Sequence, residues 1–110
     1  MEAAPTCDRA ALSDLQAGKL AALMRRLASA PNSFHSRRLK ADGIDALSVA
    51  SLEAFQRQVR PTCKDELLAD RREHPPFGSQ LLEPVEKYTR FCQTSGTSTG
   101  QPMVWLDTPA

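Results

Sequence analysis

Apolar residues recur every three or four positions in the first part of the chain, with charged residues between them. This spacing is typical of amphipathic helices, because residues three or four apart share one helical face. The first predicted helix covers about 14–29, where Ser13 and Gln16 have the spacing of a capping box and Pro31 ends the helix. The apolar stripe of this helix consists of Leu12, Leu15, Leu20, Leu23 and Leu27.

Three shorter helices are predicted to follow. Either Asn32 or Ser33 can cap the second helix, and Gly43 suits the left-handed position that follows it. Thr62 can cap the fourth helix, whose acidic first turn and basic last turn complement the helix dipole. The apolar residues that define the second and third helices are Phe34, Leu39, Leu52, Phe55 and Val59.

The pattern changes after Gly78. Val, Tyr, Thr and Phe alternate loosely over about 85–93, which predicts a strand, and "MVWLD", beginning at Met103, predicts a second strand. Every residue from Thr94 to Gly100, between the two strands, is Thr, Ser or Gly. The predicted fold is therefore mixed α+β, with helices first and a strand, a polar loop and a strand after them.

Composition narrows the function classes. The chain has 110 residues, with 41% apolar and 25% charged residues, which are ordinary values for one small globular domain. The net charge of +1 and the aromatic content of 5% give no reason to expect a nucleic-acid or membrane partner. The three cysteines have no CxxC spacing, and the chain starts with no signal-peptide pattern, so we expect a cytoplasmic location.

The polar loop has two interpretations. Gly96 and Gly100 allow positive φ, so successive main-chain N–H groups can form an anion-binding nest, to which hydroxyl groups add donors without adding charge. An ordinary hairpin loop has the same composition, and composition alone leaves both interpretations open. The Walker A pattern does not fit, because Gln101 and Pro102 follow Gly100 where that motif has Lys and Ser or Thr.

Isolated candidates for chemistry are weak. His35 and His74 do not supply enough ligands for a metal site, so we predict none. Cys92 is expected to be a small buried residue on the first strand rather than a reactive thiol.

Three stretches carry a resemblance to a known family. "TSGTSTGQP", Thr94 to Pro102, resembles the signature loop of adenylate-forming ligases, the AMP-dependent synthetases. "RPTCKDELLADRREHPPFG", Arg60 to Gly78, and "FHSRRLKADGID", Phe34 to Asp45, resemble segments of the phenylacetate–CoA ligase-like branch. The resemblance covers about residues 12–108.

The resemblance implies a fold, a reaction and a site. The chain would be part of the large N-terminal domain of an enzyme that uses ATP and Mg²⁺ to form an acyl-adenylate, and then passes the acyl group to coenzyme A. An aromatic acid is the default substrate of the branch. The residues implied to hold the β- and γ-phosphates are Thr94, Ser95, Gly96, Thr97, Ser98, Thr99 and Gly100.

Two positions depart from the family pattern. Three residues separate the two loop glycines, where the family has two, so the register of individual hydroxyls is uncertain. Met103 stands where the wider superfamily has a Lys, a residue that the phenylacetate–CoA ligase-like branch often lacks as well.

The catalytic and Mg²⁺-binding residues of the family would all lie after Ala110. We therefore expect a loose N-terminus over 1–11 and, over 12–110, an incomplete ligase domain (helical over 12–78, hairpin over 85–108) that is inactive alone. The alternative is a non-enzymatic helical interaction module with a flexible polar loop. A third, weaker hypothesis is a stand-alone nucleotide-binding module.

Overall fold

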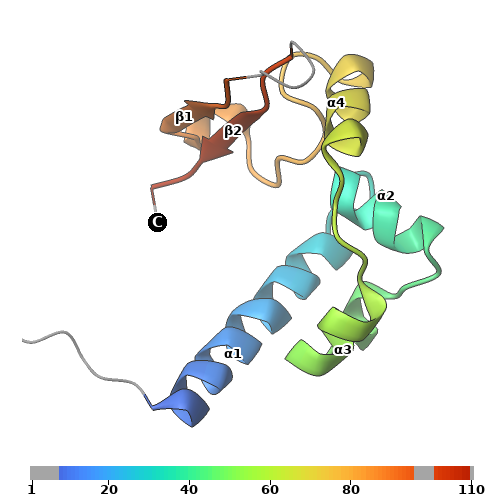
Figure 1. Ribbon diagram of the computed structural model, residues 1–110, viewed down its shortest axis with the longest axis vertical. Coiled ribbons are helices and arrows are strands. Elements are labelled where there is room, and N and C mark those ends of the chain that lie inside the picture. The colour runs from blue at the N-terminus through green and yellow to red at the C-terminus, as the bar shows by residue number, and fades with distance from the viewer. Residues whose placement is uncertain (1–7, 96–100, 110) are drawn as a thin grey trace, which may run out of the picture.

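The computed structural model describes residues 8–95 and 101–109. Figure 1 shows the helices that precede residue 60 gathered at one end of the molecule, with the last helix and a β-hairpin at the other. The elements in chain order are α1 (Arg9–Ala28), α2 (Phe34–Ala41), the 3-10 helix η1 (Ala46–Ser48), α3 (Leu52–Gln58), α4 (Lys64–Glu73), the 3-10 helix η2 (Val85–Lys87), β1 (Arg90–Gln93) and β2 (Val104–Asp107). The predicted α+β class is confirmed.

Helix α1 begins earlier than predicted. The Asp8 carboxylate accepts a hydrogen bond from the Ala11 N–H at 2.7 Å and caps the helix, so Ser13 lies inside the first turns rather than at the cap. The helix ends at Ala28, three residues before Pro31. The prediction of a start near residue 14 was wrong because Asp8 competes successfully for the N-cap position.

Helix α2 follows its predicted caps closely. Ser33 is the N-cap and accepts from the Ser36 N–H, and Gly43 takes a left-handed conformation with φ +73° after the helix. The Ser36 hydroxyl donates to the Leu27 carbonyl at 2.7 Å, which ties the end of α1 to the start of α2. Both the capping residue and the glycine were readable from the sequence.

A small apolar core joins the helices. Its buried members are Met24 and Leu27 of α1, Leu39 of α2 and Val49 after η1, with Leu20, Ile44, Ala46, Phe55, Val59 and Leu82 packed around them. The predicted leucine stripe of α1 divides between two environments. Leu27 is buried, whereas Leu12, Leu15 and Leu23 are 45%, 53% and 44% exposed.

Helix α4 is capped one residue later than predicted. Cys63, not Thr62, is the N-cap, and its N–H donates to the Glu66 carboxylate at 2.8 Å. This hydrogen bond is the half of a capping box in which the side chain of the third helical residue bonds back to the main chain of the N-cap, and it fixes the start of the helix. Glu66 therefore decides the boundary that Thr62 was expected to set.

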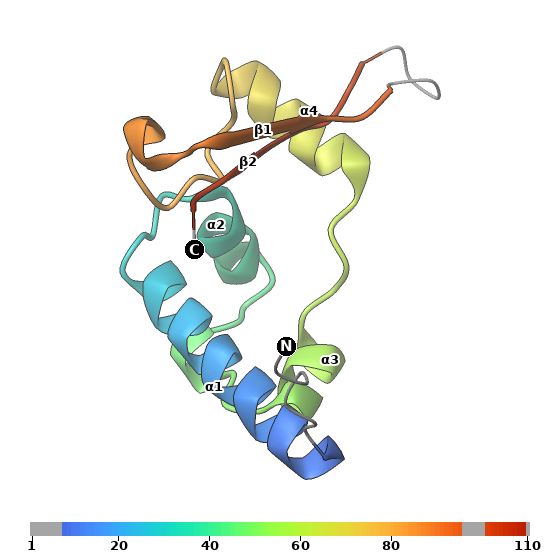
Figure 2. The same cartoon turned by 90° about the vertical axis from the view of Figure 1, so that its left-hand side faces the viewer.

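The hairpin is shorter than predicted. Strands β1 and β2 pair antiparallel from Arg90↔Asp107 to Gln93↔Val104. The predicted strand over 85–93 is wrong in its first half, because Pro84 starts the 3-10 helix η2, in which the Lys87 N–H donates to the Pro84 carbonyl at 3.0 Å. Figure 2 shows the hairpin in front of α4, and residues at the start of β2 line one small cavity with residues of α4.

Candidate functional site

The Ser/Thr/Gly run begins directly after β1, and Gln101, Pro102 and Met103 join it to β2. The Thr94 N–H donates to the Met103 carbonyl at 2.9 Å, and the Met103 N–H donates to Thr94 Oγ1 at 2.8 Å. These two bonds close the loop at its base. Of the seven predicted phosphate-binding residues, Thr94 and Ser95 belong to the described part of the chain, and Gly96, Thr97, Ser98, Thr99 and Gly100 lie outside it.

Met103 anchors the returning end of the loop. Its side chain is 8% exposed and lies around one small cavity with Leu67 and Leu68 of α4 and with Phe77. In the family resemblance, Met103 counted only as the absence of a lysine. Its place at the head of the apolar run "MVWL" was the signal that a buried residue starts here.

A buried carboxylate ties α4 to α2. Asp70 is 6% exposed and accepts from the Ser79 N–H at 2.7 Å, from the Ser79 hydroxyl and from Arg37 Nη2 at 2.9 Å. Burial works against the charge of Asp70, but the hydrogen bonds from Ser79 and Arg37 outweigh it and lower the pKa of this carboxyl group. The Phe34 N–H donates to the Ser79 carbonyl at 3.0 Å, which brings the start of α2 to the same turn.

Gly78 makes this approach possible. Its φ is +81°, and a Cβ atom at this position would lie 2.6 Å from Asp70 Oδ2. A side chain here would therefore collide with the carboxylate as well as strain the backbone. The "PPFG" motif, one of the stretches that carried the family resemblance, is thus the turn that brings the chain back onto Asp70 of α4.

A second charged group holds the segment between α3 and α4. Arg38 is 8% exposed, and its guanidinium donates to Glu66 at 3.2 Å, to the Arg60 carbonyl at 3.0 Å and to the Pro61 carbonyl. Arg60 donates to Glu66 at 2.7 Å. The Cys63 N–H, followed by the Arg60 and Arg38 guanidinium groups, lowers the pKa of Glu66 from its ordinary 4.5 to about 2.

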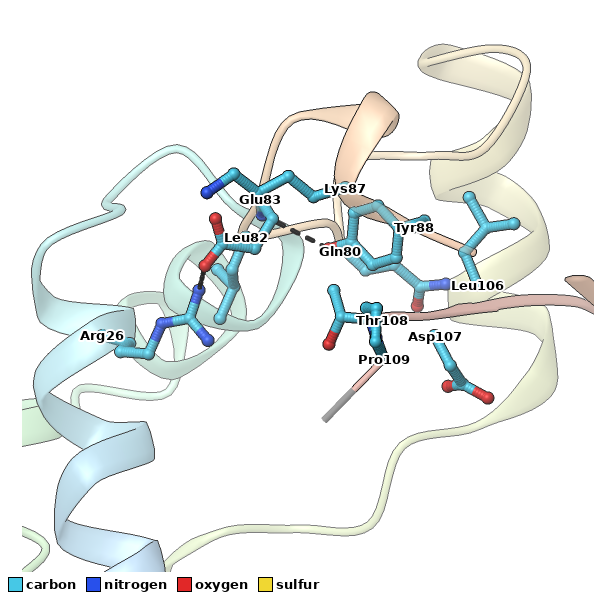
Figure 3. A pocket seen from close by; sticks show the side chains of 10 residues that line it. All are labelled: Arg26, Gln80, Leu82, Glu83, Lys87, Tyr88, Leu106, Asp107, Thr108 and Pro109. Carbon is cyan, nitrogen blue, oxygen red and sulfur yellow. Dashed lines mark hydrogen bonds and ion pairs between the residues drawn. The ribbon is translucent and has the colours of Figure 1, made fainter. Parts of the chain in front are cut away.

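A cavity of about 570 Å³ lies at the other end of the hairpin from the loop (Figure 3). Arg26 of α1 forms an ion pair with Glu83 there, and the Glu83 N–H donates to the Tyr88 hydroxyl at 3.3 Å. Lys87 and Asp107 also line it, so positive and negative side chains are mixed around the space. The lining therefore favours neither an anionic nor a cationic ligand. The ion pair between Arg26 and Glu83 joins α1 to the segment before β1.

A larger groove of about 670 Å³ lies between α1, α2 and α3. Its walls are mostly apolar, with Leu23, Met24, Phe55 and Val59 among them. His35 lies at its edge, and burial, followed by the charge of Arg38, lowers the pKa of this imidazole. The groove is therefore mostly apolar, with Arg38 and Arg60 among the residues that line it.

The described residues offer no cluster of three or more His, Cys, Asp or Glu side chains that could hold a metal ion. Cys63 is exposed, and Cys92 is half-buried on β1 rather than buried as predicted. No helix among these residues is long and apolar enough to cross a membrane.

Comparison with solved structures relates this chain to known proteins, whereas comparison by sequence does not. No family model matches the chain, and no curated protein matches it by sequence. A crystal structure of 2-hydroxyisobutyryl-CoA ligase in the postadenylation state, in complex with 2-HIB-AMP, is similar over 94% of the chain, with a TM-score of 0.77 and 24% identity. An open conformation of that ligase, in complex with 2-HIB-AMP and CoA, is similar over 94% of the chain, with a TM-score of 0.78 and 23% identity.

The chain spans only 21% and 23% of these two ligase chains. At this identity the likeness establishes the architecture, which agrees with the resemblance carried by the loop and the "PPFG" stretch. The described residues have the fold of the N-terminal part of an adenylate-forming ligase.

Proposed function

We propose that this chain is the N-terminal part of an ATP-dependent acid–thiol ligase. The enzyme activates a carboxylic acid as an acyl-adenylate and passes the acyl group to coenzyme A. The run from Thr94 to Gly100 forms the loop that holds the β- and γ-phosphates of ATP. The observation that carries the proposal is a Ser/Thr/Gly loop at the tip of a hairpin, in a chain whose fold matches the start of such a ligase.

The chemistry of the loop suits this role. Adenylation leaves negative charge on the departing pyrophosphate, and fixed main-chain N–H groups and hydroxyls stabilise that charge without reorganising during the reaction. The closed base at Thr94 and Met103 supports the proposal because it holds both ends of the loop in one place. Mg²⁺ would neutralise part of the phosphate charge, but no metal site is proposed among the described residues.

The acid is a further part of the proposal. The phenylacetate–CoA ligase-like resemblance suggests an aromatic acid, whereas the structural neighbours are named for the 2-hydroxyisobutyryl group. The proposal assigns no described residue to the acid, and both classes are therefore candidates. A screen must therefore include both arylacetic acids and short hydroxy acids.

Carboxylate-dependent ATP–pyrophosphate exchange tests the proposal. The native protein, purified from its own cell, is expected to catalyse exchange with at least one acid of the panel. Thr97→Val should reduce exchange at least tenfold, because it removes a hydroxyl from the loop. Thr89→Val is the matched control on the same hairpin. Absence of exchange with every acid, or equal exchange by the two variants, would contradict the proposal.

A second candidate function is a non-enzymatic interaction module. The observation that favours it is the exposure of Leu12, Leu15 and Leu23 along α1, since contiguous exposed apolar side chains often mark a protein-binding surface. The same side chains would also be covered by the remainder of a ligase. A native protein that folds and binds a partner as 110 residues, without exchange activity, would favour the module.

A further inference from the structure

Thr94 and Met103 form an unusual pair at the end of the hairpin. They continue the register of β1 and β2 by one position beyond Gln93↔Val104. In a regular hydrogen-bonded antiparallel pair, each residue gives its N–H to the carbonyl of the other. Here the Thr94 N–H does so, but the Met103 N–H donates to the Thr94 hydroxyl oxygen instead. We call this pair the loop clasp.

The loop clasp is fixed to the helices. The Met103 side chain is buried and lines one small cavity together with Leu67 and Leu68 of α4. Helix α4 is in turn held to α2 through Asp70, which accepts hydrogen bonds from Arg37 and Ser79. The returning end of the loop is therefore held near α4 through Met103. The Thr94 hydroxyl joins this end of the loop to the chain that leaves β1.

We propose that Thr94 is a positioning residue of the phosphate loop and acts through the main-chain N–H of Met103, rather than as one of the phosphate ligands. The proposal rests on the proposed function, because it assigns a role within the same site. An anion-binding loop has higher affinity when its donors are held in the bound arrangement beforehand, since less conformational freedom is lost on binding. The loop clasp supplies this constraint at the mouth of the loop.

Two substitutions at Thr94 separate the hydroxyl from the rest of the side chain. Thr94→Val keeps the shape and removes the acceptor, whereas Thr94→Ser keeps the acceptor and removes a methyl group. Thr94 is exposed, so neither change removes core packing. Thr89→Val is the control, because Thr89 lies at the other end of the hairpin and its hydroxyl makes no hydrogen bond within the described part of the chain.

The first readout is hydrogen exchange of the Met103 amide in the native protein without nucleotide. If Thr94 acted only by binding phosphate, its substitution would leave this rate unchanged, because no phosphate is present. We expect Thr94→Val to accelerate exchange about tenfold, in line with the loss of one hydrogen bond. Thr94→Ser and Thr89→Val should leave the rate near that of the wild-type protein.

The second readout is calorimetric titration with ATP and Mg²⁺. We expect Thr94→Val to weaken ATP affinity about tenfold and Thr94→Ser to restore it. An unchanged Met103 exchange rate in Thr94→Val would overturn the clasp. Faster exchange with unchanged ATP affinity would overturn the positioning role. If the wild-type protein does not bind ATP, the proposed function and the positioning role both fail, and the exchange result still decides whether the clasp exists.

Discussion

Gly78 is the residue at which backbone conformation and side-chain packing meet most closely. The position has φ +81°, and an added Cβ atom would lie 2.6 Å from Asp70 Oδ2. Gly43 has a similar φ of +73°, but a Cβ atom added there would meet no other atom within 4 Å. A side chain would therefore strain the backbone at both glycines but would clash with a neighbour only at Gly78.

We expect Gly78→Ala to destabilise the chain by about 3 kcal/mol and Gly43→Ala by about 1 kcal/mol. The difference reflects the displacement of the Asp70 carboxylate from its three hydrogen bonds. Urea denaturation of the two variants measures both costs. Equal costs at the two positions would show that Asp70 does not depend on the space that Gly78 leaves.

Glu66 makes stability depend on pH in the acid range. Its folded-state pKa of about 2 lies below the ordinary 4.5, so the stabilisation is fully present above the unfolded-state value. It is lost as the pH falls from about 4.5 towards 2, where the folded carboxylate is protonated. Asp70, whose pKa is also lowered, adds a loss with the same sign.

Glu66→Gln isolates this contribution. We expect the variant to be less stable than the wild-type chain at about pH 6 and the difference to shrink steadily between about pH 4.5 and about pH 2.5, because the Glu66 carboxylate of the unfolded chain binds a proton over that range while the folded one still keeps its charge. The free energy of unfolding of both chains, measured against pH, shows the convergence. A difference that stays constant over the whole of this range would contradict the lowered pKa.

At the scale of elements, the segment between α3 and α4 depends on one arginine. The Arg38 side chain is 7% exposed and binds the Arg60 and Pro61 carbonyls, whereas the neighbouring Arg37 side chain is 43% exposed. We expect Arg38→Met to cost about 3 kcal/mol and Arg37→Met about 1 kcal/mol, because the Arg38 guanidinium is the buried one of the two and because Asp70 keeps its two hydrogen bonds from Ser79 when Arg37 is replaced. Thermal unfolding with a calorimeter compares them, and a larger cost for Arg37→Met would refute this ranking.

Helix α2 is the helix that the sequence bounds best. Of its two predicted caps, Asn32 and Ser33, the structure uses Ser33, and Gly43 takes the left-handed conformation predicted for it. Asp8 and Cys63 were missed because each competes with a nearby Ser13 or Thr62 of equal or better capping ability. The structure decides between such neighbours through Ala11 at one helix and Glu66 at the other.

The position of the candidate phosphate loop was predictable from the sequence, but the hydrogen bonds that hold the segments around it were not. The Ser/Thr/Gly run and its flanking strands were visible as composition and alternation. The clasp between Thr94 and Met103, and the Asp70 contacts with Ser79, join residues nine positions apart, which no periodicity specifies. Whether Gly96–Gly100 bind phosphate stays a prediction, since these residues lie outside the described part of the chain.

The whole molecule exposes more surface than a compact chain of its size. Its accessible surface is 8037 Å² for 12.1 kDa, compared with about 6000 Å² for a compact monomer of this mass. Phe91 is 56% exposed and Trp105 is 42% exposed. The two side chains lie on opposite faces of the hairpin, as the pairs Phe91↔Leu106 and Cys92↔Trp105 require. A two-stranded hairpin with apolar residues on both faces is typical of part of a larger, covered sheet.

The intact mass of the native protein in its own cell is the most direct test of the central claim that these residues serve as the first part of a longer ligase. We expect a mass several times 12.1 kDa, which the 21–23% coverage of the ligase neighbours implies. Such a protein would cover α1 and both faces of the hairpin with its own chain. A native mass of 12.1 kDa would contradict the claim and favour the interaction module.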